Sequence, residues 1–322
     1  MTRRTKKDRT TRPDAPAPAL AAILGGVTIG DPLTWAGLQV FPLNRPNGHD
    51  PSYALLDDLL ERGEAEVAEL NEHGSVGTIV VKNRSGLDAL LLDGMELHGA
   101  KQNRMVNLTV IVGHHSEAAI PVSCVEQGRW AYRSKGFASA KRTVGSKLRN
   151  WKAYMVAESF TASGRPHTDQ GRVWDHVEAY VEQTGADSPT AALDDAFAES
   201  EGRIEDCVGH LKRLDAAGAV VALNGEIVGF DLLDHPATFQ RLWESLLRGY
   251  ALDATLEEQT GKALSREDIE AWLTSVANDG ALTRHDVPGV GVYYSVHGPR
   301  IAGGAVVHAG HAVHTALFPA VR

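Results

Sequence analysis

Short apolar segments separated by polar turns follow one another along residues 67–112. The apolar segments cover residues 67–70, 77–81, 89–92 and 106–112. Residues 71–74 and 83–86 are rich in Asn, Gly and charged side chains, which favour turns. Segments this short are typical of β-strands, and turns this short leave no room for the crossover helices of a parallel sheet. This region therefore predicts an antiparallel sandwich or barrel.

Two further kinds of segment precede this region. Residues 27–29 and 38–43 have strand patterns and are bounded by Gly and Pro. Residues 51–62 place apolar side chains at helical spacing, with acidic side chains on the opposite face. We therefore predict a helix over residues 51–62.

The centre of the chain changes to helical periodicity. The predicted helices cover residues 173–183, 190–214, 239–252 and 266–278. Asp169 and Ser265 are the expected N-caps of the first and the last of them. The dipeptide Asn224-Gly225 between two apolar segments predicts a β-hairpin with a type I′ turn.

Residues 289–296 and 305–318 return to strand patterns, and we expect them to rejoin the first sheet. The predicted fold class is therefore α+β, with an antiparallel β-rich sandwich or barrel in the N-terminal half, a helical middle region and closing C-terminal strands. The expected organisation is a disordered basic tail and one large domain. The tail covers residues 1–20 and the domain residues 21–322, which divide into a β-rich part (21–135), a mainly helical part (140–285) and the closing strands (286–322).

Charge is distributed unevenly along the chain, whose formal net charge is −9. Residues 1–12 carry six basic side chains and one acidic side chain, a sum of +5, so the rest of the chain carries −14. A body this acidic is not suited to coat a phosphate backbone. Nucleic acid is therefore not expected as a partner except through the basic tail, which lacks apolar periodicity.

Composition narrows the class of protein further. A hydrophobic fraction of 43% and a charged fraction of 23% are typical of a globular protein. No segment approaches the roughly 20 apolar residues that span a bilayer, and the apolar residues 19–24 are too few for a secretory signal. Cys124 and Cys207 have no CxxC neighbour, so we expect reduced thiols and no metal site. We predict a cytoplasmic protein without a membrane partner.

The densest group of polar side chains lies at residues 93–104, between two predicted strands. Its members include Glu96, Lys101, Gln102, Asn103 and Arg104. The basic side chains suit a phosphate or carboxylate, the amides suit a base edge, and the glycines let a ligand approach the backbone. The alternative is a solvated loop whose Asn and Gly are structural, and the sequence leaves both interpretations open.

A second polar group occupies residues 121–130 and contains Cys124, Glu126, Arg129 and Trp130. Arg129 and Trp130 are suited to cation–π contacts or to stacking on an aromatic base. The carboxylate near Cys124 raises the pKa of its thiol, so a nucleophilic role needs a nearby cation. The alternative is a buried Cys, a structural Glu–Arg pair and a core Trp, and for Cys124 we favour this alternative.

Three histidines, His308, His311 and His314, are spaced three residues apart near the end of the chain. On a strand, His308 and His314 would share a face. The group lacks a neighbouring carboxylate and matches no standard zinc spacing, so we interpret it as structural or surface-exposed. Asp231, at a predicted strand end, is a weaker site candidate. The sequence has no Walker A, HExxH or GxSxG motif and no GxGxxG that opens a helix after a strand.

The two polar groups also carry a resemblance. DGMELHGAKQNR, followed by IPVSCVEQGRW, resembles the family named for its association with ADP-ribosylglycohydrolases and rhodanese/phosphatase-superfamily proteins. Later blocks at residues 169–177, 220–233, 239–254 and 310–319 are also similar to that family. The resemblance implies work near ADP-ribose, its phosphate esters or another NAD-derived species, and it specifies no cofactor. Met95 stands where we expect a polar or acidic residue beside Glu96, which argues against a mechanism with paired carboxylates.

Two functional hypotheses follow. In the first, a pocket binds or hydrolyses a phosphorylated nucleotide derivative of the ADP-ribose type. Its candidate catalytic residues are Glu96, Cys124 and Glu126, and its candidate ligand-binding residues are Lys101, Gln102, Asn103, Arg104, Arg129 and Trp130. In the second, the protein is a non-catalytic binding or scaffold module, and the same side chains form a structural network beside a helical region that docks a protein partner. Unpaired Lys101 and Arg104 in an open site favour the first, and buried, mutually paired charges favour the second.

Overall fold

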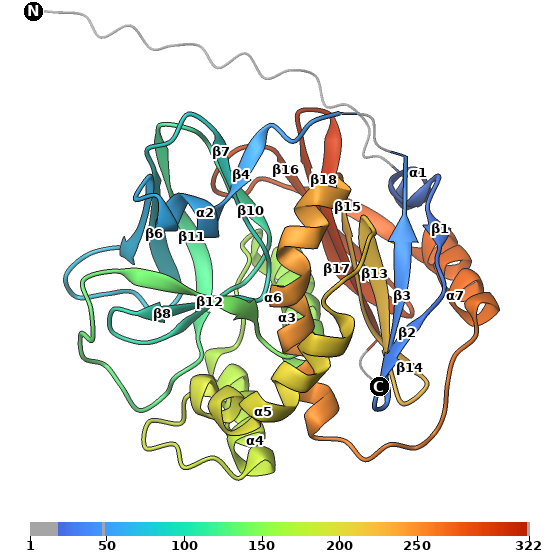
Figure 1. Ribbon diagram of the computed structural model, residues 1–322. Helices are drawn as coiled ribbons and strands as arrows, with labels where there is room; N and C mark the ends of the chain where they lie inside the picture. Colours follow the sequence, from blue (N-terminus) through green and yellow to red (C-terminus); the bar gives the residue numbers. More distant parts are fainter. Residues whose placement is uncertain (1–18, 47–48, 321–322) are drawn as a thin grey trace, which may run out of the picture.

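The computed structural model describes residues 19–46 and 49–320. Two β-rich halves lie side by side, and helices α3 (Ser146–Ser163) and α6 (Pro236–Thr255) lie between them (Figure 1). Residues 53–143 form the smaller sheets at the left of Figure 1, and the larger sheet lies at the right. The predicted α+β class, with a strand-rich N-terminal half, is confirmed.

The larger sheet has nine strands, all antiparallel, in the order β1-β3-β13-β14-β18-β17-β16-β15, with β2 paired to β3. Their bounds are β1 Thr28–Ile29, β2 Leu33–Trp35, β3 Leu38–Asn44, β13 Gly218–Leu223, β14 Glu226–Leu233, β15 Ala281–His285, β16 Val292–Gly298, β17 Ile301–His308 and β18 His311–Pro319. Strand β13 pairs with β3 on one side and β14 pairs with β18 on the other. The closing strands therefore rejoin the sheet that the first strands begin, as expected.

The predicted hairpin connects β13 and β14. Asn224 and Gly225 have φ angles of 50° and 81°, and a type I′ turn requires a positive φ at both central residues. A second turn of this kind joins β17 and β18, where Ala309 and Gly310 have φ angles of 50° and 86°. His308 and His311 flank that turn and are paired across it. Two local dipeptides thus set the register of both hairpins.

The smaller half contains a six-stranded sheet and a three-stranded sheet. The first has the order β12-β8-β9-β11-β6-β5 and the second the order β10-β7-β4. Their bounds are β4 Tyr53–Leu55, β5 Ala65–Glu69, β6 Thr78–Asn83, β7 Asp88–Leu91, β8 Met95–Gly99, β9 Arg104–Val106, β10 Val110–Val112, β11 Ser116–Cys124 and β12 Phe137–Thr143. The pair β4 and β7 is parallel, and the other pairs are antiparallel.

Two of the local predictions were wrong in this half. The run 106–112 is not one strand, because the chain turns at Asn107–Thr109 and its two ends join different sheets. The side chains of Asn107 and Thr109 are buried and hydrogen-bonded to other parts of the protein. This turn is therefore in the interior, where a short polar stretch is not recognised as a turn from the sequence. The helix predicted over 51–62 covers only α2 (Leu56–Glu61), since Tyr53–Leu55 pairs with β7 as strand β4.

The remaining helices are α1 Leu20–Leu24, α4 Gln170–Thr184, α5 Leu193–Leu211 and α7 Arg266–Asp279. Both predicted N-caps are confirmed. The Asp169 side chain accepts hydrogen bonds from the first turn of α4, and Ser265 forms a capping box with Asp268 at the start of α7. Most of the expected basic tail lies outside the described residues. No helix among the described residues is long and apolar enough to span a membrane.

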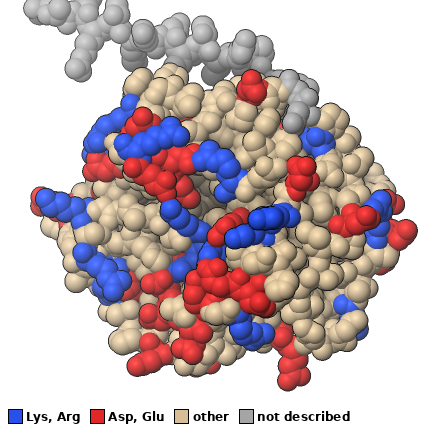
Figure 2. All heavy atoms as spheres, viewed as in Figure 1, with Lys and Arg blue, Asp and Glu red and all other residues tan. Residues whose placement is uncertain are grey.

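Ion pairs connect neighbouring elements of the fold. Arg248 of α6 pairs with Glu201 and Glu205 of α5, and Lys141 of β12 pairs with Glu61 of α2. On the face drawn in Figure 2, basic and acidic side chains lie next to one another. A surface of alternating sign is unlike the continuous basic face that contacts a nucleic-acid backbone.

Candidate functional site

The two polar segments meet at the end of strand β11. Cys124 of β11 lies opposite Arg104 of β9, and the backbone N–H of Val125 donates to the carbonyl of Asn103. A third segment, the first turn of α4, is clamped to them by Gln170. Its side-chain amide donates to the carbonyl of Cys124 and accepts from the N–H of the same residue, each across 2.8 Å. The motifs thus form one contiguous site.

Arg104 is completely buried in this site. Its guanidinium donates to Sγ of Cys124 at 2.7 Å and to Oε1 of Gln102 at 3.2 Å. It also pairs with Oε1 of Glu69 at 3.3 Å. Glu69 is the last residue of β5 and lies outside both polar segments predicted from the sequence. The predicted phosphate-binding Arg104 is therefore occupied by protein groups.

Burial raises the pKa of the Cys124 thiol; the Arg104 cation lowers it only in part, and the resulting pKa is about 11. The side chain is fully buried. A thiol in this state is protonated at neutral pH and is a poor nucleophile. The geometry matches the alternative of a small buried hydrophobic side chain.

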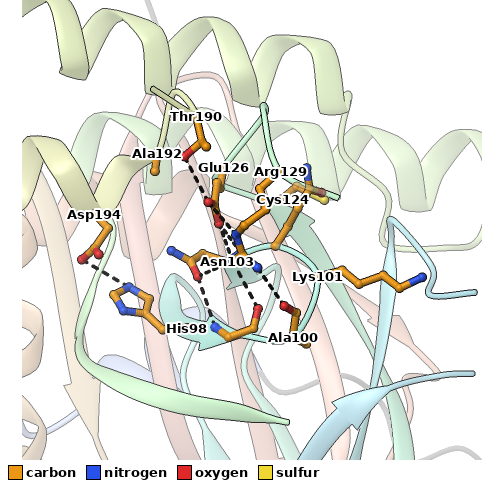
Figure 3. Close-up of polar contacts among 12 residues, drawn as sticks. His98, Ala100, Lys101, Asn103, Cys124, Glu126, Arg129, Thr190, Ala192 and Asp194 are labelled. Carbon is orange, nitrogen blue, oxygen red and sulfur yellow. Dashed lines mark hydrogen bonds and ion pairs between the residues drawn. The ribbon is translucent and has the colours of Figure 1, made fainter. Parts of the chain in front are cut away.

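Glu126 is held by Arg129 in a two-point contact, with Nε to Oε1 at 2.7 Å and Nη2 to Oε2 at 2.6 Å. It also accepts from the backbone N–H of Asn103 and from the hydroxyl of Thr190 (Figure 3). Burial raises the pKa of Glu126, but these hydrogen bonds, led by that of Arg129, bring it below its ordinary value. The guanidinium of Arg129 also donates a hydrogen bond to the carbonyl of Ala100.

Glu96 belongs to a separate group on the other side of the β8–β9 loop. It accepts from Arg142 at 2.8 Å and from His98 at 3.0 Å, and Arg142 also binds Asp194 at the start of α5. Burial raises the pKa of Glu96, but Arg142 and His98 lower it more, to about 2. Glu96 and Glu126 are thus bound to different cations, and each is kept ionised.

Lys101 and Trp130 differ from the other predicted residues. The Lys101 ammonium donates to the carbonyl of His73 and lies 5.3 Å from the ring centroid of Trp130 and 5.1 Å from that of Tyr132. The Lys101 side chain is largely covered, whereas Trp130 and Tyr132 are 47% and 52% exposed. We call Lys101, Trp130 and Tyr132 the aromatic face. It is the part of the predicted site that presents large side chains to solvent.

A buried group of charges from segments that the sequence did not connect lies between the two β-rich halves. We call it the central ionic cluster; its members are Asp93, Arg149, Lys152, Asp231 and His314. Arg149 donates to Asp93 at 3.0 Å and to Asp231 at 2.8 Å, Lys152 donates to Asp93 at 2.8 Å, and His314 lies 3.1 Å from Asp231. Arg149 and Lys152 are one turn apart on α3, a spacing visible in the sequence but indistinguishable there from an exposed basic face.

The family model of the ARG and Rhodanese-Phosphatase-superfamily-associated Protein domain, ARPP-1, matches residues 26–318. The chain belongs to this family. No curated protein and no solved structure matches it. The two ARPP-1 motif segments are the ones that meet at β9 and β11, and the later blocks supply Gln170, Asp231 and His314 to the contacts above.

Three residues of the central ionic cluster of this ARPP-1 chain have the side chains and spacing of metal ligands. Asp93, Asp231 and His314 each offer one ligand atom, and these atoms lie within 4.8 Å of one another. Both carboxylates already bind Arg149, and Asp93 also binds Lys152. Two buried cations at the same oxygens repel a metal ion, so these residues fit a structural ionic network better than a metal site.

The histidines of the β17–β18 hairpin have acidic neighbours, contrary to the sequence expectation. His314 contacts Asp231, and His308 lies 2.9 Å from Asp88. His311 stacks on His49 at 3.5 Å between ring centroids. The carboxylates come from distant strands, so the absence of an acidic neighbour in the sequence was not informative.

The ARPP-1 chain also contains a cavity of about 610 Å³ beside the β13–β14 hairpin, lined in part by Lys147, Glu226 and Trp272. None of the nine predicted site residues lines it. Lys147 forms an ion pair of 2.8 Å with Glu257, and Glu257 also borders the cavity. Its acidic lining is a poor match for a phosphorylated ligand.

Proposed function

We propose that this ARPP-1 chain is a binding module for a nucleotide derivative of the ADP-ribose type and that its motif residues are not the catalysts of a reaction. The observation that carries this proposal is the pairing of the three candidate catalytic residues. Glu96 and Glu126 are each bound by an arginine, and Cys124 is buried against a third. A general base must be free to accept a proton near neutral pH, and these carboxylates have pKa values lowered away from that range.

The aromatic face supplies the binding surface. Trp130 and Tyr132 expose about half of their surface, and aromatic bases stack on such rings at about 1–3 kcal/mol per base. The ammonium of Lys101 lies beside both rings and adds positive charge there. Arg133 and Lys135, in the same loop, are exposed cations suited to a pyrophosphate.

The buried motif network serves this surface by holding its loop. Arg129 donates to the carbonyl of Ala131, which follows Trp130, and to the carbonyl of Ala100 in the first polar segment. The N–H of Arg133 donates to the carbonyl of Ala100. A loop fixed by such bonds loses less conformational entropy when a ligand binds. The choice of ADP-ribose over other nucleotides rests on the association that gives the family its name.

Calorimetric titration with ADP-ribose, adenosine and ribose 5-phosphate tests the proposal. We expect ADP-ribose to bind, Trp130→Ala to weaken its affinity about tenfold, and Trp130→Phe to retain most of it. Leu87→Ala, which removes an exposed apolar side chain in a different loop, is the matched control. If wild type and Trp130→Ala bind ADP-ribose with equal affinity, the aromatic face is not the binding site.

Product analysis after long incubation with ADP-ribose separates binding from catalysis. We expect the ligand to be recovered unchanged. Turnover by wild type that Glu126→Gln abolishes, while the variant keeps its melting temperature, contradicts the non-catalytic assignment and restores the hydrolytic hypothesis.

A further inference from the structure

A second cavity, away from the aromatic face, combines an unpaired cation with two stacked imidazoles. It has a volume of about 330 Å³ and is lined by residues that follow β3 and by the turn between β17 and β18. Arg45, His49, Asp234 and His311 line it, and Ile23 and Val307 supply apolar wall. None of these residues belongs to the two motif segments or the central ionic cluster.

Arg45 has no hydrogen-bond or ion-pair partner among the described residues, and its Nη1 atom is shielded from solvent. Arg45 as a whole is only partly buried, but an N–H group shielded from solvent without a partner costs free energy, because it loses water and gains no hydrogen bond. The other arginines that border buried groups in this chain, such as Arg104 and Arg149, are paired with carboxylates. The shielded, unpaired Nη1 of Arg45 therefore marks a place where an anion from outside the protein fits.

The acidic residue of the cavity does not serve as that anion. Asp234 accepts a hydrogen bond from the hydroxyl of Tyr53 on Oδ1 and contacts Nε2 of His49 on Oδ2 at 3.1 Å. Both carboxylate oxygens are thus occupied from within. The contact fixes the ring of His49 and makes Nε2 the natural place for its proton, which leaves Nδ1 as the second polar atom of that ring.

His311 lies flat against His49, with 3.5 Å between centroids and 14° between planes. Its position is set by the tight turn at Ala309 and Gly310, both with positive φ. Ala309 is strained in that region, where Gly is the usual residue. The turn is followed directly by His311, whose imidazole stacks on His49 and adds an N–H to the wall of the cavity.

We propose that this cavity is a binding site for a small molecule that carries a phosphate group. Arg45 supplies a two-point contact to the phosphate oxygens, the imidazole of His311 supplies a further N–H, and the apolar wall accepts the organic part of the ligand. A volume of about 330 Å³ is within the range of small-molecule sites. The site is separate from the proposed nucleotide surface and does not depend on it.

Titrations with inorganic phosphate, phenyl phosphate and benzoate, followed by the side-chain NMR signals of His49 and His311, test the proposal. Phenyl phosphate is expected to shift both signals and to bind more tightly than inorganic phosphate. Arg45→Gln should weaken phenyl phosphate binding about tenfold or more, because charge-assisted bonds to phosphate are among the strong ones. Arg213→Gln, which changes an exposed arginine elsewhere, should leave it unchanged.

Three results overturn the site. The first is wild-type protein whose His49 and His311 signals do not respond to any phosphate probe at millimolar concentration. The second is phenyl phosphate affinity in Arg45→Gln equal to that of wild type. The third is tighter binding of benzoate than of phenyl phosphate, which replaces phosphate by carboxylate as the ligand class. Trp130→Ala serves as an additional control, since it should abolish neither signal change.

Discussion

The guanidinium of Arg104 donates a hydrogen bond to the sulfur of Cys124 across 2.7 Å and so joins the two motif segments at their buried ends. The same guanidinium pairs with Glu69. Loss of Arg104 leaves the Glu69 carboxylate, whose side chain is 3% exposed, without its cation. This relationship makes the motif residues interdependent in folding.

We therefore expect Arg104→Met to lower the free energy of unfolding by about 3 kcal/mol, because it strands a buried carboxylate. Urea denaturation measures the change. Glu69→Met/Arg104→Met should recover much of the loss, since no buried charge remains. Arg266→Met, which removes a pair with the exposed Asp31, should change stability by less than about 1 kcal/mol. If Arg104→Met leaves the free energy of unfolding unchanged, Arg104 is not needed for stability and is available for a ligand.

The thiol of Cys124 should be unreactive in the folded protein. Its pKa is raised to about 11 and that of Cys207 to about 12, in both cases chiefly by burial. At pH 8 we expect iodoacetamide to modify both at least about 100-fold more slowly than in the urea-unfolded chain. Mass spectrometry of timed samples measures the rates. Fast, selective modification of Cys124 would show that the thiolate is accessible and would reopen the nucleophile hypothesis.

Stability should fall at acidic pH partly through Glu96. Its pKa is about 2 in the folded protein against an ordinary value of 4.5. A carboxyl with a depressed folded pKa stabilises the fold above its unfolded pKa, and that contribution disappears as the pH falls to the folded pKa. The loss should therefore occur between about pH 4.5 and pH 2 and amount to about 3 kcal/mol.

The matched variant for this pH effect is Glu96→Gln. Its Arg142 retains Asp194 as a partner, so the variant should fold and should show a shallower decline in stability over the same pH interval. Chemical denaturation at a series of pH values compares the two slopes. Parallel curves for wild type and Glu96→Gln mean that Glu96 does not titrate as described.

The central ionic cluster should respond unequally to removal of its two basic residues. Arg149 binds both Asp93 and Asp231, whereas Lys152 binds Asp93 alone. Arg149→Met leaves Asp231 with only Tyr250 and His314 as side-chain partners and should lower stability by about 3–5 kcal/mol. Lys152→Met leaves Asp93 paired with Arg149 and should cost less. Thermal denaturation ranks the two, and a reversed order excludes Arg149 as the centre of the network.

Local signals in the sequence were sufficient for several elements. Asn224-Gly225 predicted its turn, and Asp169 and Ser265 predicted helix starts, because each of these acts on backbone groups within a few residues. The many charged residues in the two motif segments also indicated correctly that these side chains cluster. Whether their charges are paired within the protein or free to bind a ligand could not be predicted, since the partners Glu69 and Thr190 come from other parts of the chain.

The sequence by itself therefore determined the strand-rich start, the helix caps, the hairpin turn and the family motifs, all of which depend on neighbouring residues. Only the tertiary structure decided that Arg104 and Arg149 are buried and paired while Arg45 is not. Arg149 reaches Asp93 and Asp231 across 56 and 82 residues of sequence. The free energy of a charge depends on the burial and the partners that folding brings to it, and spacing along the chain specifies neither.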